Sequence, residues 1–273
     1  MKMSRTLYEV PSIQEDSITA LSKKLLCVTE ELTQSNLKLQ QMQKERTDML
    51  ANLSHDLRAP VTAIRGAVDY LLEDPSSSEE ERISVLQMID RRTQVLETLI
   101  RNMYELFCAE GPGQELSLQT ISAAPFLEEY FYSTILDSRY EDRQMDLKLQ
   151  ENLDCSLNID VQRIIRVLDN LMTNAAKYSD PGSPIILSAK REHDCLSISV
   201  IDRGIGIPPE SLDKIFGRTY TVSSARTPNS ATGSGLGLSI AKAIIEKHHG
   251  TLTCQSVLGQ GSTFTFSLPI SEL

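Results

Sequence analysis

The stretch from Asp160 to Ser179, DVQRIIRVLDNLMTNAAKYS, decides the fold of the second half of the chain. Its apolar residues recur every three or four positions, which predicts an amphipathic helix. On the opposite face Asn170, Asn174 and Lys177 recur at i, i+4 and i+7. Asn is disfavoured inside a helix, so something should compensate: amide oxygens suit Mg²⁺ and an ammonium group suits phosphate. A solvated polar face is the alternative that this stripe alone leaves open.

Strand-like and helix-like segments alternate on both sides of this helix. Strand-like runs occur at 115–120, 145–150, 185–189, 196–202, 251–257 and 263–268, and further helical runs at 125–137 and 235–249. The alternation predicts an α/β sandwich, and about 160 residues are enough for a core of its own. Gly111-Pro112-Gly113 breaks helix and marks the start of this domain.

The N-terminal part of the chain carries a heptad seam. Between positions 18 and 53, steps of three and four meet eleven positions, and only Ser35 and Arg46 among them are polar. The nine apolar positions are Ile18, Leu21, Leu25, Val28, Leu32, Leu39, Met42, Met49 and Leu53. The seam predicts a coiled coil with another chain, and an amphipathic helix lying on its own domain is the alternative. The helix is expected to continue to about Leu72. After a turn signal, Ser78 and Glu81 form a capping box that starts a second helix.

The second helix has an apolar stripe of its own, made of Leu86, Ile89, Leu96, Ile100, Met103 and Phe107. Two antiparallel helices with one stripe each cannot enclose a core alone. Two such hairpins from two chains can do so as a four-helix bundle, which predicts a homodimer.

Charge and composition exclude several classes of function. The chain has 273 residues, with 27 Lys and Arg against 37 Asp and Glu, and a formal charge of −10. Direct binding of nucleic acid is not expected, because phosphate backbones are held by excess Lys and Arg. No run reaches the roughly 18 apolar residues of a membrane span, and no signal peptide is evident, so a cytoplasmic location is expected. Five scattered cysteines without a CxxC pair indicate neither disulfides nor a zinc site.

A histidine stands in the first helix, within Ser54-His55-Asp56-Leu57-Arg58-Ala59-Pro60. At about 100° per residue, His55 lies about 200° from Leu53 and from Leu57 on the seam, so its imidazole is expected to face solvent. An exposed histidine without a function is the alternative for this segment taken alone.

Three glycine-rich segments lie in the second half of the chain. They are Asp202-Arg203-Gly204-Ile205-Gly206-Ile207, Gly233-Ser234-Gly235-Leu236-Gly237-Leu238 and Gly259-Gln260-Gly261-Ser262-Thr263-Phe264. The second opens a helix, where glycines let backbone amides approach an anion and the helix dipole favours it. Each segment taken alone is just as typical of an ordinary turn as of an anion-binding site. The chain has neither a P-loop nor a dinucleotide-binding fingerprint.

Taken together and in this order, the motifs resemble those of sensor histidine kinases of two-component signalling, over about Leu39 to Leu268. The segment around His55 resembles the phosphoacceptor box, and the run from Asn170 to Ser179 is similar to the N box. The glycine segments resemble the G1, G2 and G3 boxes, and 214–218 resembles the F box.

The resemblance implies a multidomain α and α+β protein. An N-terminal coiled coil (1–45) precedes a two-helix hairpin (46–110) that dimerises into a four-helix bundle and carries the phosphoacceptor. An α/β sandwich of the gyrase type (114–273) follows and binds ATP with Mg²⁺.

The resemblance also implies roles for individual residues. Asn174 ligates Mg²⁺, with Asn170 supporting the metal and the phosphates, Lys177 touches phosphate, Tyr178 stacks on adenine and Asp202 accepts the adenine amino group. The remaining residues implied to line or close the nucleotide site are Gly204, Gly206, Ile207, Phe216, Arg218, Gly233, Gly235, Leu236, Gly237 and Leu238.

The expected reaction is transfer of the γ-phosphoryl group of ATP to neutral His55, with Asp56 accepting the imidazole N–H, and then to an Asp of a separate response regulator. Related ATPases that use water commonly have Glu four residues before the metal-binding Asn. Asn170 stands there in this chain and cannot act as a base, so little ATP hydrolysis is expected.

Several positions depart from the family pattern. Ala59 stands where relatives that also dephosphorylate their partner present Thr or Asn, so phosphatase activity has no support. In the lid expected at 208–232, Thr219 and Thr221 replace an aromatic residue and an Arg, with Arg226 as a candidate substitute. Two other functions stay open: a nucleotide-binding scaffold without catalysis, and a serine kinase of the anti-sigma type.

Overall fold

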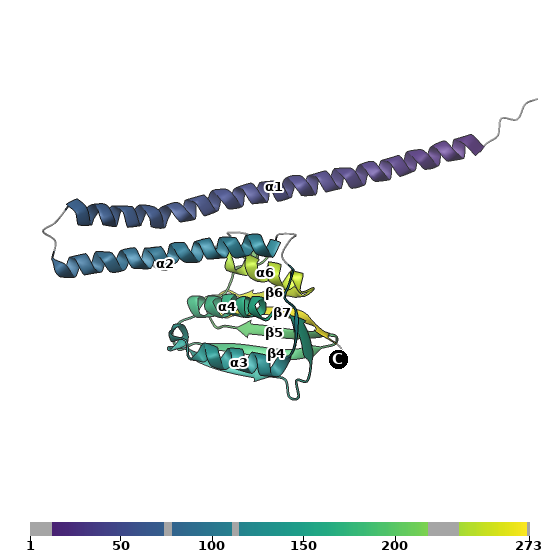
Figure 1. Ribbon diagram of the computed structural model, residues 1–273. Coiled ribbons are helices and arrows are strands. Elements are labelled where there is room, and N and C mark those ends of the chain that lie inside the picture. The colour runs from purple at the N-terminus through teal and green to yellow at the C-terminus, as the bar shows by residue number, and fades with distance from the viewer. Residues whose placement is uncertain (1–12, 74–77, 111–114, 218–234, 272–273) are drawn as a thin grey trace, which may run out of the picture. The chain divides into compact units, whose positions relative to one another are not determined.

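A computed structural model describes residues 13–73, 78–110, 115–217 and 235–271 (Figure 1). Two long helices, α1 (Ile13–Glu73) and α2 (Glu79–Glu110), precede a sheet domain. The chain divides into two compact units, and the division falls inside α1 between Asn52 and Leu53. The domain boundaries expected from the sequence at 45/46 and 110/114 remain predictions.

The first unit consists of the N-terminal part of α1, which the heptad pattern predicted to be helical. Its described seam side chains are all at least 53% exposed, namely Leu21, Leu25, Val28, Leu32, Leu39 and Met42. A row of exposed apolar side chains is unfavourable in water, so this part of α1 needs a partner surface.

Within the second unit, α1 and α2 form the predicted hairpin. Leu53 and Ala67 on α1 and Leu99 on α2 are buried, each at most 7% exposed. The capping box at the start of α2 is confirmed. The Ser78 backbone N–H donates to Glu81 Oε2 at 3.0 Å, and the Glu81 N–H donates to Ser78 Oγ at 3.2 Å.

The apolar stripe predicted for α2 is only partly buried. Ile89, Leu96 and Met103 are half-buried, whereas Leu86, Ile100 and Phe107 remain 55%, 48% and 41% exposed. At about 100° per residue, the six positions fall within about 100° of one face of the helix, so exposed and half-buried members share one stripe. One chain alone therefore leaves part of this stripe exposed.

The sheet domain contains most of the buried core. Its elements are β1 (Gln119–Ser122), α3 (Ala123–Ile135), η1 (Ser138–Tyr140), β2 (Gln144–Leu149), β3 (Ser156–Ile159), α4 (Val161–Tyr178), β4 (Pro184–Glu192), β5 (Cys195–Ile201), α5 (Pro209–Leu212), α6 (Gly237–Lys247), β6 (Thr251–Val257) and β7 (Gly261–Ser271). The seven strands form one sheet in the order β1-β3-β7-β5-β4-β2, with β6 paired to β7. Only β2 and β4 are parallel among the described pairs.

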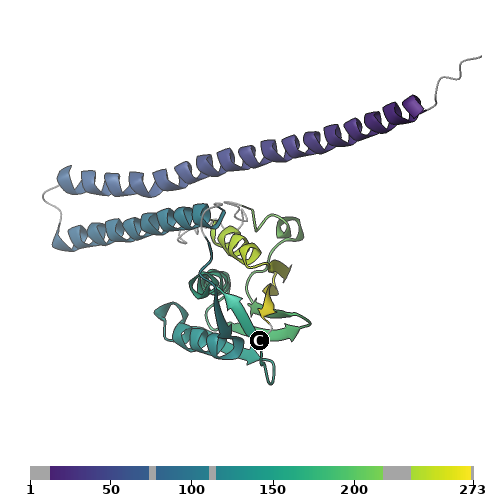
Figure 2. The same cartoon turned by 45° about the vertical axis from the view of Figure 1, so that its right-hand side comes forward.

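Alternating side chains explain why helices pack against this sheet. Ile198 and Val200 of β5 and Phe266 of β7 are fully buried, while Ser199 and Thr265 between them are half-buried and bond to each other at 2.8 Å. Period-two alternation of this kind directs the apolar side chains toward covering helices. Figures 1 and 2 show α3, α4 and α6 packed against the sheet, and the predicted α/β sandwich is confirmed.

The strand predictions differ from the structure mainly at the N-terminal edge of the domain. The strand expected at 115–120 is observed as β1 at Gln119–Ser122, and β3 was not predicted. β3 is only four residues long and contains Ser156 and Asn158, which are uncommon in strands. Its pairing with β1 and β7 stabilises it.

Candidate functional site

Helix α4 presents the polar stripe that the sequence predicted. Its buried residues include Ile164, Leu168 and Leu171, each 0% exposed, whereas Asn170 and Asn174 are half-buried on the other face. The helix starts at the N-cap Asp160, whose Oδ1 accepts the Arg163 N–H at 3.2 Å. Packing of the apolar face therefore fixes the direction of the two amides.

Asn170 connects α4 to the glycine segment that opens α6. Its Nδ2 donates to the Gly237 carbonyl oxygen at 3.1 Å. A Cβ added to Gly237 would lie 3.4 Å from Asn170 Oδ1, at the border of ordinary van der Waals contact, so the glycine and the amide are close neighbours. Because the nitrogen of the amide is used in the protein, its oxygen is the atom suited to a hard cation.

Asp202 follows β5 and is only 5% exposed. Its Oδ1 accepts the backbone N–H groups of Gly204 at 2.8 Å and Ser262 at 3.2 Å. Burial raises the pKa of this carboxyl group, and the two N–H bonds oppose that shift. A buried carboxylate held by its Oδ1 can offer Oδ2 to a donor on a ligand.

The loop after Asp202 lies directly against the end of α4. The Ile205 N–H donates to the Tyr178 carbonyl oxygen at 3.0 Å. A Cβ on Gly204 would lie only 2.1 Å from that same oxygen. Gly206 has a φ of +68°, and a Cβ there would lie 2.1 Å from the Val257 carbonyl oxygen. Both positions require glycine, because any other residue would displace backbone.

The other predicted nucleotide-site residues are placed as follows. Lys177 Nζ lies 5.1 Å from the centroid of the Tyr178 ring, and Phe216 has Lys242 Nζ 5.9 Å from its ring centroid. The Ile207 N–H donates to Ser256 Oγ at 2.8 Å. In the G2 segment, Gly235 has φ +65, Leu236 is buried, and Gly237 and Leu238 are half-buried in the first turn of α6. Arg218, Gly233, Thr219, Thr221 and Arg226 lie outside the described residues.

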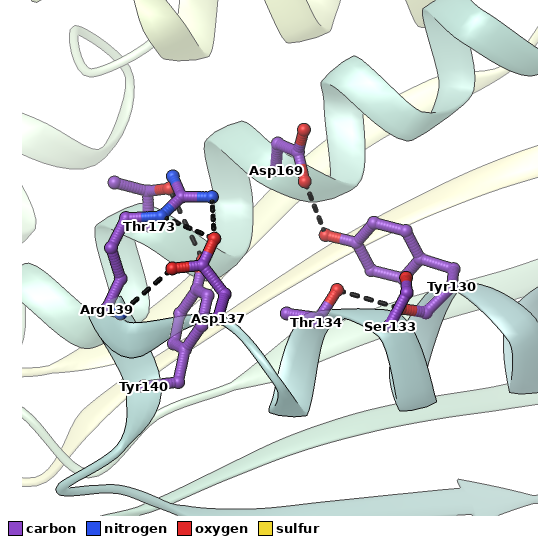
Figure 3. Close-up of polar contacts among 8 residues, drawn as sticks. All are labelled: Tyr130, Ser133, Thr134, Asp137, Arg139, Tyr140, Asp169 and Thr173. Carbon is purple, nitrogen blue, oxygen red and sulfur yellow. Dashed lines mark hydrogen bonds and ion pairs between the residues drawn. The ribbon is translucent and has the colours of Figure 1, made fainter.

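A second set of contacts holds α4 from the side of α3 and η1 (Figure 3). The Tyr130 hydroxyl donates to Asp169 Oδ1 at 3.0 Å, and the Tyr140 hydroxyl lies 3.4 Å from Thr173 Oγ1. Asp169 and Thr173 each precede one of the two asparagines in the chain. Sequence reasoning missed these tyrosines, because nothing local distinguishes them from core aromatic residues.

His55 is described on α1, separately from these contacts. Its side chain is 83% exposed, as the helical geometry predicted, and its Nδ1 lies 3.6 Å from Asp56 Oδ1. That separation exceeds a normal hydrogen bond but is within the range of a charge interaction. On either side of the histidine in the chain, Leu53 is buried and Leu57 is half-buried.

His248 directly follows the last residue of α6 and is buried, only 4% exposed. Its Nε2 accepts the Asp160 backbone N–H at 3.0 Å, and its Nδ1 lies 2.8 Å from the Ile244 carbonyl oxygen. Burial lowers the pKa of this imidazole. His248 is therefore a neutral group that connects α6 to the start of α4.

Two known families match the chain in the regions just described. Residues 45–112 match the His Kinase A (phospho-acceptor) domain. Residues 159–272 match the family of histidine kinase-, DNA gyrase B-, and HSP90-like ATPases. This order of domains, with His55 in the first and the nucleotide-site motifs in the second, decides the family. The chain belongs to the sensor histidine kinases.

Individual relatives of this sensor histidine kinase are long proteins. Sensor histidine kinase WalK of Bacillus subtilis is 33% identical over 85% of the chain. Sensor protein SrrB of Staphylococcus aureus is 29% identical over the whole chain. The chain spans 38% and 46% of the full length of these two relatives.

Solved histidine kinases share the fold. The Acinetobacter baumannii kinase AdeS gives a TM-score of 0.62 at 22% identity, covering 80% of this chain and 98% of its own. Kinase ThkA, solved in complex with the response regulator TrrA, gives a TM-score of 0.60 at 22% identity. The match covers 82% of this chain and 61% of the ThkA chain. In the part of this kinase that the structure describes, none of the helices combines the length and apolar character needed to cross a membrane.

Proposed function

We propose that the chain is an ATP-dependent protein-histidine kinase, which phosphorylates His55 and passes the phosphoryl group to an Asp of a response regulator. The observation that carries this proposal is a histidine with an 83% exposed side chain beside a carboxylate in the same chain as a nucleotide site that lacks a water-activating acid at Asn170. Such a site holds ATP for a nucleophile other than water.

ATP fits the described site through a few groups of defined chemistry. Asp202 would accept the adenine amino group, which selects adenine over guanine. Tyr178 would stack on the base and Lys177 would pair with phosphate. The oxygens of Asn174 and Asn170 would hold Mg²⁺, which fits an amide whose nitrogen already donates to Gly237. When bound, Mg²⁺ neutralises charge on the phosphates.

The residues of the phosphoacceptor helix would then perform the transfer. With its proton on Nδ1 facing Asp56, His55 presents the lone pair of Nε2 to the γ-phosphorus. A P–N bond forms, the bond to the β,γ-bridging oxygen breaks, and ADP leaves with the bond electrons. The imidazole becomes cationic in this step, and the Asp56 carboxylate 3.6 Å from Nδ1 stabilises that charge.

The partners of the reaction are proposed on separate grounds. A phosphohistidine needs an acceptor, and the solved relative ThkA is in complex with a response regulator.

A second copy of the chain is proposed because three apolar side chains of the hairpin are each at least 48% exposed, namely Leu86 and Ile100 on α2 and Val61 on α1. Two hairpins would bury them in a four-helix bundle.

The proposal is tested by incubating the purified chain with γ-labelled ATP and Mg²⁺ and measuring the stability of the label on the protein. Acid-labile, alkali-stable label that disappears in His55→Gln is the expected result. Acid-stable label would favour the serine kinase, and nucleotide binding without label would favour the scaffold. Asp56→Asn, which keeps size but removes charge, should slow labelling about tenfold or more.

A further inference from the structure

Helix α4 ends in a way that leaves its last carbonyl groups in need of donors. The helix stops at Tyr178, and its C-cap Ser179 has an extended backbone with φ −106 and ψ 154. Helices commonly end on a left-handed glycine whose neighbours satisfy the final carbonyls. No such turn follows Tyr178. The Ser179 hydroxyl donates to the Ala175 carbonyl oxygen at 2.7 Å, and the carbonyls after Ala175 must be satisfied by groups from elsewhere in the chain.

Arg143, between η1 and β2, supplies those donors. Its Nη2 donates to the Ala176 carbonyl oxygen at 2.8 Å, and its Nη1 donates to the Ser179 carbonyl oxygen at 2.9 Å. Nη1 also donates to the carbonyl oxygen of Asp180. A guanidinium group has several donors in one plane and a fixed positive charge, which suits the negative end of a helix dipole.

The backbone around Arg143 is itself held in place. The Arg143 N–H donates to the Tyr140 carbonyl oxygen at 2.9 Å, and the Asp142 carbonyl oxygen accepts the Gly182 N–H at 2.9 Å. The Tyr140 side chain is only 3% exposed. The guanidinium therefore extends from a fixed turn, and the loop that follows α4 is bound to the same turn.

The turn that Arg143 holds contains the residues proposed to meet the nucleotide. Lys177 and Tyr178 lie between the carbonyls of Ala176 and Ser179 that Arg143 binds. The Tyr178 carbonyl oxygen instead accepts the Ile205 N–H at 3.0 Å, and Gly204 packs directly against it. One turn of backbone thus sets the position of Lys177, Tyr178 and the loop after Asp202.

We propose that Arg143 is a positioning residue for ATP binding. It fixes the last turn of α4 so that the phosphate-binding lysine, the tyrosine and the Gly204 loop are arranged before the nucleotide arrives. This inference rests on the proposed function, because it takes ATP as the ligand. Arg143 is not among the residues proposed to contact ATP or to take part in the transfer to His55, so its loss is expected to affect binding rather than the transfer step.

The test measures binding of a non-hydrolysable ATP analogue with Mg²⁺ by calorimetry, and the ATP dependence of labelling of His55, in the full chain. Arg143→Ala is expected to raise both Kd and KM about tenfold or more, because charged donors to partly buried carbonyls are lost. The maximal labelling rate at saturating ATP should stay within about threefold. Arg143→Lys, which keeps the charge but loses the fork, should recover part of the affinity.

Matched variants separate this inference from the proposed function. Arg191→Ala removes another arginine that donates to a backbone carbonyl, that of His193 at 3.4 Å, and should bind as the unchanged chain does. If the unchanged chain binds no analogue and acquires no label, the proposed function fails. If it binds and labels while Arg143→Ala keeps its Kd and KM, or loses only its maximal rate, Arg143 has no positioning role. If Arg143→Ala does not fold, Arg143→Lys decides, and an unchanged Kd there overturns the inference.

Discussion

Asp202 is a buried carboxyl group whose charge opposes folding. Burial raises its pKa above the ordinary value of 3.8. A carboxyl group with a raised folded-state pKa contributes stability below the unfolded-state pKa and loses that contribution as pH rises through the folded-state pKa. Ionisation of Asp202 therefore costs stability, and the proposed hydrogen bond from the adenine amino group would offset part of that cost.

Asp202→Asn should separate these two effects. The amide oxygen can still accept from Gly204 and Ser262, but the amide nitrogen would face the adenine amino group as a second donor. We expect nucleotide affinity to fall more than about tenfold while the fold remains. The Tm of the variant relative to the unchanged chain should rise between about pH 4 and 7. Thermal unfolding across that pH range and analogue binding measure both, and a variant with unchanged affinity would exclude adenine recognition by Asp202.

A second prediction concerns the buried His248 and the pH dependence of stability. Burial lowers the pKa of its imidazole, while Asp160 raises it and Arg163 and His249 lower it further. A base with a lowered folded-state pKa contributes stability above its unfolded-state pKa of 6.5 and loses it as pH falls. His248→Gln keeps an acceptor for the Asp160 N–H but does not titrate. Urea unfolding at pH 7, 6 and 5 should show a smaller loss of stability in the variant, and equal losses would contradict a neutral His248.

At the scale of elements, α4 is held along its whole length by groups from other segments. Asp160 caps its start, Tyr130 and Tyr140 bond its middle and Arg143 binds its end. The sequence predicted the helix and its two asparagines, because periodicity and helix propensity are local properties. It could not predict the residues that hold the helix, since Tyr130 is 39 positions from Asp169. Only folding brings such groups together.

Removing one of these contacts should destabilise the domain by a measurable amount. Burial raises the pKa of Tyr130 most, and the negative charge of Asp169 raises it further. The Tyr130 hydroxyl therefore stays protonated and donates. Tyr130→Phe should cost about 1–2 kcal/mol of unfolding free energy, because the Asp169 carboxylate loses a donor. The control is Tyr132→Phe on the same helix, whose side chain is 63% exposed and which should change stability by less than about 0.5 kcal/mol. Equal effects in urea unfolding would show that the Tyr130–Asp169 bond contributes nothing.

At the scale of the whole molecule, the order of the motifs along the chain was enough to predict both the helical part and the ATP-binding type of fold. The sequence did not reveal how much of the α2 stripe one chain buries by itself: Ile89 and Leu96 are half-buried, whereas Leu86 and Ile100 stay exposed. A spacing of three and four residues describes the whole stripe and does not tell which of its members are buried. That division depends on tertiary packing, which only the structure shows.

The exposed part of the α2 stripe leads to a prediction about assembly. Leu86 is 55% exposed, and Gln87 beside it is also exposed. A glutamate buried in a bundle core is strongly unfavourable, so Leu86→Glu should raise the dimer dissociation constant about tenfold or more. Gln87→Glu adds the same charge outside the proposed core and should leave it within about twofold. Sedimentation velocity over a concentration series distinguishes them, and equal dissociation constants would exclude a dimer through this face.

The position of the phosphoryl group after reaction with ATP and Mg²⁺ tests the proposed reaction most directly. Peptide mapping by mass spectrometry at alkaline pH, where phosphohistidine survives, can separate His55 from its neighbour Ser54. We predict phosphate on His55 and none on that peptide in His55→Gln. Phosphate on Ser54, or on any residue when His55 is replaced, would contradict it.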